Sequence, residues 1–375
     1  MMMLTINKKT TIELPKKLGL IQALRGLAAI IVVCYHTGTL YSKNLNWVVF
    51  GNAFKFGHVG VDVFFVISGF IIYYIHHKDI GQPAKIYSFI YKRFTRIYPL
   101  YWIVLLFKLL IKPTDVLTIL IAFCMFPIRH AFINVSWTLS YEIFFYLCFG
   151  IFILKFNKYT KIILCLFLGS ICLKAILASM KIELNFGEFY FSFLSSAYII
   201  EFSLGILAGY LVLNNSLLEW RYWLFFGGII LFSTSSLITV SLVNDIANEI
   251  NAVSFAQAER ISCYLESNFL FFFGFPSLLI ITGAALIDLN DKVKVPHFLL
   301  KIGDASYSIY LIHAMILNII TLKLKPINKE YLNYTVIPVI ATAMFAGYLI
   351  HILIEKRMMN FFHSKYVKFT KKSKL

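Results

Sequence analysis

The stretch Ile21-Gln-Ala-Leu-Arg25-Gly-Leu-Ala-Ala-Ile-Ile-Val-Val-Cys-Tyr-His36 is a long apolar run that contains two ionisable side chains. His36 follows Arg25 by eleven positions, which in a helix is about three turns plus 20°, so both side chains leave the same face. They differ in depth by roughly 16 Å. Ionisable groups inside a membrane helix cost about 2.5–3.5 kcal/mol and are usually functional. The stretch therefore predicts a membrane helix with a buried polar path along one face.

The composition indicates an all-α, polytopic integral membrane protein. Of the 375 residues, 59% are hydrophobic and 14% are charged, and the mean hydropathy is +0.77, whereas a soluble domain is about 45–50% apolar and 25% charged. We expect one membrane domain over residues 1–375, with short basic tails at 1–17 and 356–375. The first apolar run lacks a small-residue cleavage site, so it is expected to stay as a span.

Apolar stretches of spanning length predict about ten transmembrane helices. They lie near residues 18–40, 57–75, 97–111, 138–154, 162–179, 197–213, 222–243, 269–287, 307–322 and 336–354. A further apolar run, 116–127, has only 12 residues and ends in proline. That length favours a re-entrant or interfacial segment, although whether it spans is left open by the sequence.

The net charge of +17 is explained by membrane orientation rather than by nucleic-acid binding. With ten spans and a cytoplasmic N-terminus, the inside segments carry more than twice as many Lys and Arg residues as the outside segments. This bias predicts that both termini are cytoplasmic and that 116–127 does not cross. If it crossed, the basic loop 155–161 and the basic C-terminal tail would move outside.

This topology places three arginines near the cytoplasmic rim. Arg25 lies near the inner end of the first span, and Arg93 and Arg96 lie at the inner start of the third. Arginine forks bind phosphate oxygens in a bidentate manner. We therefore expect Arg25, Arg93 and Arg96 to bind a phosphate-bearing cofactor. The alternative, orientation by positive charge, fully explains Lys92 and can also explain Arg93.

Three titratable groups are expected in the outer half of the membrane: His36, Asp62 in the second span and Glu142 at the start of the fourth. A neutral histidine is suited to take a proton from a hydroxyl, and a carboxylate on its second nitrogen would hold the required tautomer. The sequence does not decide between Asp62 and Glu142 for this role. The alternatives are an interhelical hydrogen bond for His36 and structural pairing for Asp62.

Other polar and small residues carry weaker indications. His313 lies in the middle of a span, and Glu201 could pair with Lys174 or Arg129. Small residues in the second span are typical of close helix contacts: Gly57, Gly60, Ser68 and Gly69. The cysteines and the remaining histidines lack metal-ligand spacing, so no metal is expected.

Four blocks of this sequence resemble the acyltransferase 3 family of membrane acyltransferases, which includes O-antigen and exopolysaccharide acetyltransferases. The blocks are Ile21–Ala29 continuing to His36, Gly60–Phe70, Arg93–Trp102 and Ser136–Glu142. Weaker matches follow at Gly274–Pro276 and Gly303–His313. The opening block and the Arg-Ile-Tyr-Pro-Leu-Tyr-Trp string are most similar to the exopolysaccharide-production subgroup.

The resemblance implies a ten-helix fold and acyl transfer from cytoplasmic acyl-CoA, with acetyl-CoA favoured, to a sugar hydroxyl. It assigns Arg25 and His36 to the active site and implies a functional role for the Arg93/Arg96 pair, with the CoA phosphates as the expected ligand. Family members often end the last span with Glu-Lys-Pro. This chain has Glu355-Lys-Arg357 instead, so Glu355 is given no role. The chain ends at Leu375, so the extracytoplasmic hydrolase-like domain of some relatives is not expected.

The resulting hypothesis is an O-acyltransferase of the bacterial inner membrane that modifies a surface or exported polysaccharide, or its lipid-linked precursor. Its partners would be the lipid bilayer, acyl-CoA and the glycan acceptor. His36 would act as a base in direct transfer, or as a nucleophile that forms an acyl-histidine. Two other classes are kept open: a secondary transporter or flippase, and an accessory subunit of a polysaccharide export system.

Overall fold

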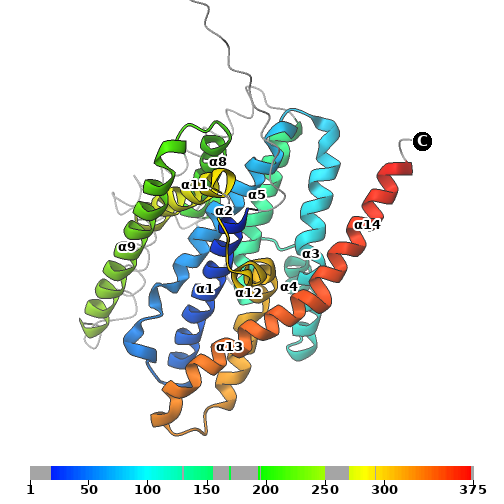
Figure 1. Cartoon of the computed structure of the whole chain (residues 1–375). Helices are drawn as coiled ribbons and strands as arrows, with labels where there is room; N and C mark the ends of the chain where they lie inside the picture. Colours follow the sequence, from blue (N-terminus) through cyan, green and yellow to red (C-terminus); the bar gives the residue numbers. More distant parts are fainter. Residues whose placement is uncertain are drawn as a thin grey trace, which may run out of the picture.

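The computed structural model describes residues 18–128, 131–154, 196–249, 270–291 and 293–372, together with residues 169, 193 and 194. Within these residues all regular structure is helical. Eight helical segments are long and apolar enough to cross a membrane (Figure 1). Their main helices are α1 (Gly19–Leu45), α2 (Gly60–His76), α3 (Ile86–Ile111), α5 (Trp137–Leu154), α9 (Arg221–Glu249), α11 (Phe275–Asn290), α12 (His297–Lys323) and α13 (Leu332–Ile350).

The shorter apolar helix α8 (Ala197–Leu213) coincides with a further predicted span. Nine of the ten predicted spans therefore coincide with described helices. The tenth, 162–179, lies outside the described residues except for residue 169, and so does the loop 155–161. The protein is a multi-pass membrane protein whose described part is all-helical, as predicted. The run 116–127 contains only α4 (Val116–Phe123), whose length of about 12 Å is too short to cross a 30 Å hydrocarbon core.

Several helices extend beyond the apolar stretches that predicted them. Helix α3 begins at Ile86 rather than near residue 97, and α12 begins at His297 rather than near 307. The basic segment after residue 355, expected to be a short tail, forms α14 (Lys356–Lys372), joined to α13 by a π-helical turn, His351–Glu355. Hydropathy marks the part of a helix that lies in lipid, whereas the backbone hydrogen bonds continue into polar sequence.

Helix α1 lies inside the bundle against α2 and α12 (Figure 1). Asp288 of α11 holds its first turn, because the carboxylate accepts hydrogen bonds from the backbone N–H groups of Leu20 (2.8 Å) and Ile21 (3.3 Å). Gly303 of α12 packs on α1 so closely that a Cβ atom there would lie 2.0 Å from the Gln22 carbonyl oxygen. This close contact places the Arg25 face of α1 against α12.

Glycines also bring α2, and the short 3₁₀ helix Lys55–Val59 before it, close to their neighbours. A Cβ atom would lie 2.4 Å from the Ile31 carbonyl oxygen at Gly57, 2.7 Å from the Ala28 oxygen at Gly60, and 2.0 Å from the Phe202 oxygen at Gly69. The predicted role of these three glycines in helix contact is confirmed. Ser68, which was predicted with them, lines a pocket instead.

Replacing Gly205 of α8 by valine is expected to destabilise the protein by about 1–3 kcal/mol or more. A Cβ atom at this position would lie 2.0 Å from the Val66 carbonyl oxygen of α2, and this backbone cannot move aside without separating the two helices. Gly227→Val in α9 is the matched control, because no described atom lies within 4 Å of a Cβ there. Thermal unfolding in detergent should show a lower midpoint for Gly205→Val alone. Equal midpoints for the two variants would contradict this account of α2–α8 packing.

Candidate active site

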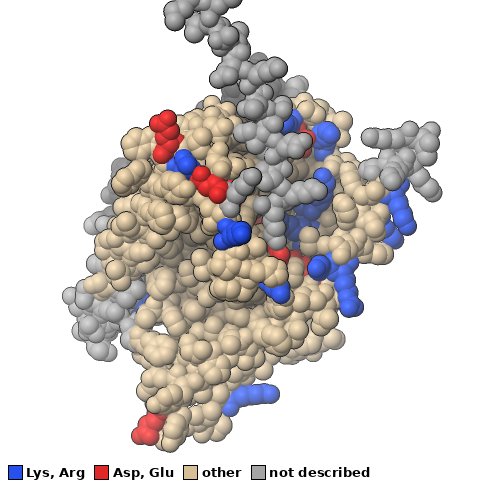
Figure 2. Space-filling view, in the orientation of Figure 1, with Lys and Arg blue, Asp and Glu red and all other residues tan. Residues whose placement is uncertain are grey.

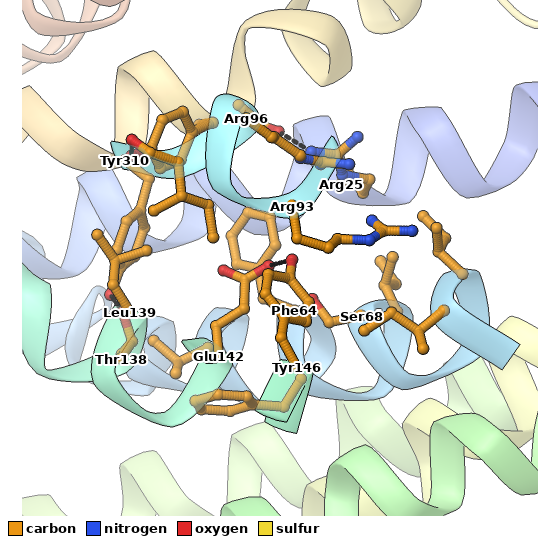
Figure 3. A pocket seen from close by; sticks show the side chains of 18 residues that line it. Arg25, Phe64, Ser68, Arg93, Arg96, Thr138, Leu139, Glu142, Tyr146 and Tyr310 are labelled. Atoms are coloured by element: carbon orange, nitrogen blue, oxygen red, sulfur yellow. Dashed lines mark hydrogen bonds between the residues drawn. The ribbon is translucent and has the colours of Figure 1, made fainter. Parts of the chain in front are cut away.

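A buried pocket lies between α1, α2, α3, α5 and α12 (Figure 3). Its empty volume, including the space at its open mouth, is about 780 Å³. The polar side chains that line it are Arg25, Ser68, Arg93, Arg96, Thr138, Glu142, Tyr146, Ser306, Tyr307 and Tyr310. The pocket therefore combines cationic groups with hydroxyls in an otherwise apolar wall.

The three arginines predicted to share one rim do line this single pocket. Arg25 donates hydrogen bonds to Ser306 Oγ (3.0 Å) and to Gln22 Oε1 (3.3 Å). The Arg93 guanidinium lies 5.5 Å from the centre of the Tyr146 ring, and its buried Nε–H has no hydrogen-bond partner in the described structure. The guanidiniums of Arg25 and Arg96 are close enough to repel each other. An anion in the pocket would offset that repulsion and accept a hydrogen bond from the unpaired Arg93 Nε–H.

Glu142 belongs to this arginine cluster, and the expectation that it lies with His36 and Asp62 is corrected. Its carboxylate accepts a hydrogen bond from the Tyr146 hydroxyl and attracts Arg25 and Arg96. Figure 3 shows the Glu142 and Tyr146 side chains rising from α5 towards the arginines. Glu142 is the sixth residue of α5, which places it about 7–8 Å along the helix, deep enough to meet the arginine side chains.

Glu355 lies near the arginines of the pocket, and it was not identified from the sequence as a candidate site residue. It is only 5% exposed, and its carboxylate accepts hydrogen bonds from Ser308 Oγ (2.5 Å) and His351 Nδ1 (2.8 Å). It also attracts Arg25 and Arg96. Glu355 was given no role in the sequence analysis because Arg357 stands where family members often have the proline of Glu-Lys-Pro. The signal that could have found it is a lone carboxylate at the end of an apolar span.

His36 does not line the arginine pocket and does not contact Asp62 or Glu142. Among the described residues its aromatic neighbours are Tyr35 and His313, and the centres of the His36 and His313 rings are 5.0 Å apart. Tyr310 lies between the pocket and this histidine pair, because it lines the pocket and its ring centre is 5.7 Å from that of His313. The carboxylate–histidine arrangement expected from the sequence is therefore not formed.

Asp62 faces α8 instead of His36. It is 3% exposed and lies beside the fully buried Glu201. The two residues with which Glu201 was expected to pair, Lys174 and Arg129, lie outside the described residues. The reason that Asp62 meets Glu201 is helix register. Asp62 precedes Gly69 by seven residues and Glu201 precedes Gly205 by four, so each acid shares a helix face with the glycine through which α2 and α8 touch.

Metal-ligating side chains do not gather in the part of the chain that the structure describes. No group of three or more His, Cys, Asp or Glu residues there is arranged to hold a metal ion. The described pocket instead brings three arginines together with a carboxylate and several hydroxyls.

Comparison with protein-family models decides the identity of the chain. Residues 19–356 match the acyltransferase 3 family model, which is described as an acyltransferase domain. The chain belongs to this family. It is therefore a membrane acyltransferase that transfers groups other than aminoacyl groups.

Two curated relatives are similar to this acyltransferase. The exopolysaccharide production protein ExoZ of Rhizobium meliloti (strain 1021) is 27% identical over 286 residues, which cover 72% of this chain and 80% of the relative. The peptidoglycan O-acetyltransferase OatA of Listeria monocytogenes is 31% identical over 180 residues, which cover 41% of this chain and 27% of the relative. No solved structure matches.

The sequence blocks that resemble the family converge on the pocket of this acyltransferase. They are distant in sequence, yet the first contributes Arg25, the second Ser68, the third Arg93 and Arg96, and the fourth Glu142. The late block from Gly303 to His313 adds Ser306 and Tyr310 to the wall and ends at the histidine that contacts His36.

Proposed function

We propose that this acyltransferase moves an acetyl group from cytoplasmic acetyl-CoA to a hydroxyl of a surface or exported polysaccharide, or of its lipid-linked precursor. The observation that carries the proposal is the single pocket in which Arg25, Arg93 and Arg96 meet. The names of the two relatives, one in exopolysaccharide production and one in peptidoglycan O-acetylation, support a glycan acceptor and an acetyl group.

The residues of the pocket fit the phosphates of CoA. Three guanidiniums face two carboxylates, Glu142 and Glu355, so the cluster with all groups ionised has a surplus positive charge. The buried, unpaired Nε–H of Arg93 is a donor for which no protein acceptor is provided in the described structure. Because an unpaired buried donor costs about 1–3 kcal/mol, a phosphate oxygen that accepts from it would bind favourably.

His36 is proposed as the base. It would accept the proton of the acceptor hydroxyl while the hydroxyl oxygen forms the new ester bond and the thioester C–S bond breaks. The proton would then pass to the departing CoA thiolate. Arg25 and His36 lie on one face of α1 about 16 Å apart along its axis, so the long arm that joins the CoA phosphates to the thioester would run between them. Ping-pong kinetics, with a labelled acyl-enzyme trapped at neutral pH before the acceptor is added, would favour an acyl-histidine intermediate instead.

The proposed location is the inner membrane of a bacterium with both termini in the cytoplasm. On the face shown in Figure 2, most Lys and Arg side chains gather towards the end where α3 begins and α14 ends. Positive charge is concentrated on the cytoplasmic side of membrane proteins. This orientation would place Arg25, Arg93 and Arg96 in the cytoplasmic half of the membrane, nearer to the compartment that contains acetyl-CoA.

The proposal is tested by the ester content of surface polysaccharide, measured by NMR, in a deletion strain of the source organism with and without the restored gene. An ester signal that disappears on deletion and returns with the wild-type gene is expected. Unchanged esters would overturn the polysaccharide-ester proposal. Loss of the polymer itself would favour a transporter or an export subunit. Binding of CoA to the detergent-solubilised protein separates these classes, because neither of the last two requires it.

A further inference from the structure

His313 is a fully buried histidine that the proposed chemistry has not yet used. Its Nδ1 lies 2.7 Å from the Tyr310 carbonyl oxygen and 3.2 Å from that of Ile309. A carbonyl oxygen can only accept, so Nδ1 carries the hydrogen of the neutral ring. The other nitrogen, Nε2, is then an acceptor with a free lone pair, and it has no hydrogen-bond partner in the described structure.

The surroundings of this lone pair point to one donor. The His36 and His313 rings touch, with centres 5.0 Å apart and planes inclined by 50°, but no hydrogen bond joins them. Tyr310, whose ring also lies against His313, directs its hydroxyl away to Thr138 Oγ1 at 2.9 Å. An unsatisfied buried acceptor beside a ring that can carry an N–H is satisfied most simply by that N–H.

We infer that His313 positions His36 for catalysis by accepting a hydrogen bond from one ring nitrogen of His36 through Nε2. The inference rests on the proposed role of His36 as the base. With one nitrogen of His36 donating to His313, the other presents its lone pair to the acceptor hydroxyl, which is the tautomer a general base needs. His313 thus takes the orienting role that the sequence assigned to Asp62 or Glu142.

The register of the two helices explains why these residues meet. His313 follows Ser306 by seven residues and His36 follows Arg25 by eleven, so each pair occupies one face of its helix. Arg25 and Ser306 are hydrogen bonded, which turns those faces towards each other. The close contact of Gly303 with the Gln22 backbone holds α1 and α12 together about one helical turn before the Arg25–Ser306 hydrogen bond.

Two substitutions of His313 separate its two nitrogens. Asparagine keeps a donor at the Nδ1 position for the Tyr310 carbonyl but has no acceptor at the Nε2 position, whereas glutamine places an oxygen acceptor near Nε2. Purified variants in proteoliposomes would be assayed with radiolabelled acetyl-CoA and with polysaccharide from the deletion strain, de-esterified by mild base. His313→Asn is expected to lower kcat at least about tenfold with an unchanged KM for acetyl-CoA, and His313→Gln is expected to retain most of the turnover.

A second comparison uses the His36→Ala background. If His313 acts only through His36, adding His313→Asn there should not lower the residual turnover further. Equal losses in the Asn and Gln variants, or a further loss in the His36→Ala background, would overturn the inference. If His313→Asn does not fold, a folded His313→Gln with the activity of His36→Ala would overturn it as well. A wild-type protein that neither binds CoA nor transfers acetyl would instead refute the proposed function, and the inference with it.

Discussion

Replacing His36 by alanine is expected to lower the rate of acetyl transfer by about 10²–10⁴-fold while leaving the affinity for CoA unchanged. The substitution removes the proposed base, and His36 does not line the arginine pocket where the phosphates would bind. Turnover in proteoliposomes and binding of CoA to the solubilised protein measure the two quantities separately. Loss confined to turnover is the result expected of a group that acts on the reacting atoms.

The matched control for this experiment is His297→Ala. His297 is an exposed histidine at the first turn of α12, so its removal changes the histidine content without touching the pocket. Both variants should express and unfold like the wild type. If His36→Ala retained wild-type turnover, another group would have to take the proton of the acceptor hydroxyl, and the proposed role of His36 would be wrong.

Arg96→Ala is expected to weaken the binding of CoA by about 10- to 100-fold, which corresponds to the roughly 1.5–3 kcal/mol of a hydrogen bond to a charged group. Arg96 lines the pocket beside Glu142, and its loss removes one of three guanidiniums. Arg96→Lys should recover only part of the affinity, because an ammonium group cannot form the bidentate contact. Binding isotherms with CoA and with dephospho-CoA would report the affinity and the phosphate that is recognised.

Arg357→Ala provides the charge-matched control for Arg96. Arg357 is exposed on α14, two positions after the buried Glu355, so its removal changes the net charge equally without changing the pocket. Affinity should fall only for Arg96→Ala at fixed ionic strength. Equal weakening by both variants would indicate that general positive charge, and no specific phosphate contact, attracts CoA.

The helical architecture could be predicted closely from hydropathy. Spans of about twenty apolar residues have few alternatives in lipid, because each backbone polar group must be bonded within the helix. The sequence favoured a re-entrant or interfacial segment at 116–127 and left open whether it spans, and α4 there has only eight residues. The ends of α3 and α12 were not predicted, because the helical backbone extends beyond the apolar part of the sequence.

The part of the candidate site that could be predicted is the part in which residues meet because they lie at the same depth in the membrane. Arg25, Arg93 and Arg96 were expected at one level and do line one pocket. The partners of the acidic groups and of His36 were not predictable, because they depend on the direction in which each helix face points. Asp62 was expected near His36, yet the glycine contact between α2 and α8 turns it towards Glu201.

The sequence by itself therefore determined the membrane fold, the family and the positions of the polar residues along each span. Only the tertiary structure decided that Glu142 and Glu355 join the arginines and that His313 contacts His36. The physical reason is that hydropathy sets the depth of a residue, whereas a shift of one position turns its side chain by about 100°. The neighbour that a side chain meets is thus determined by how the helices pack, and here by the close contacts at a few glycines.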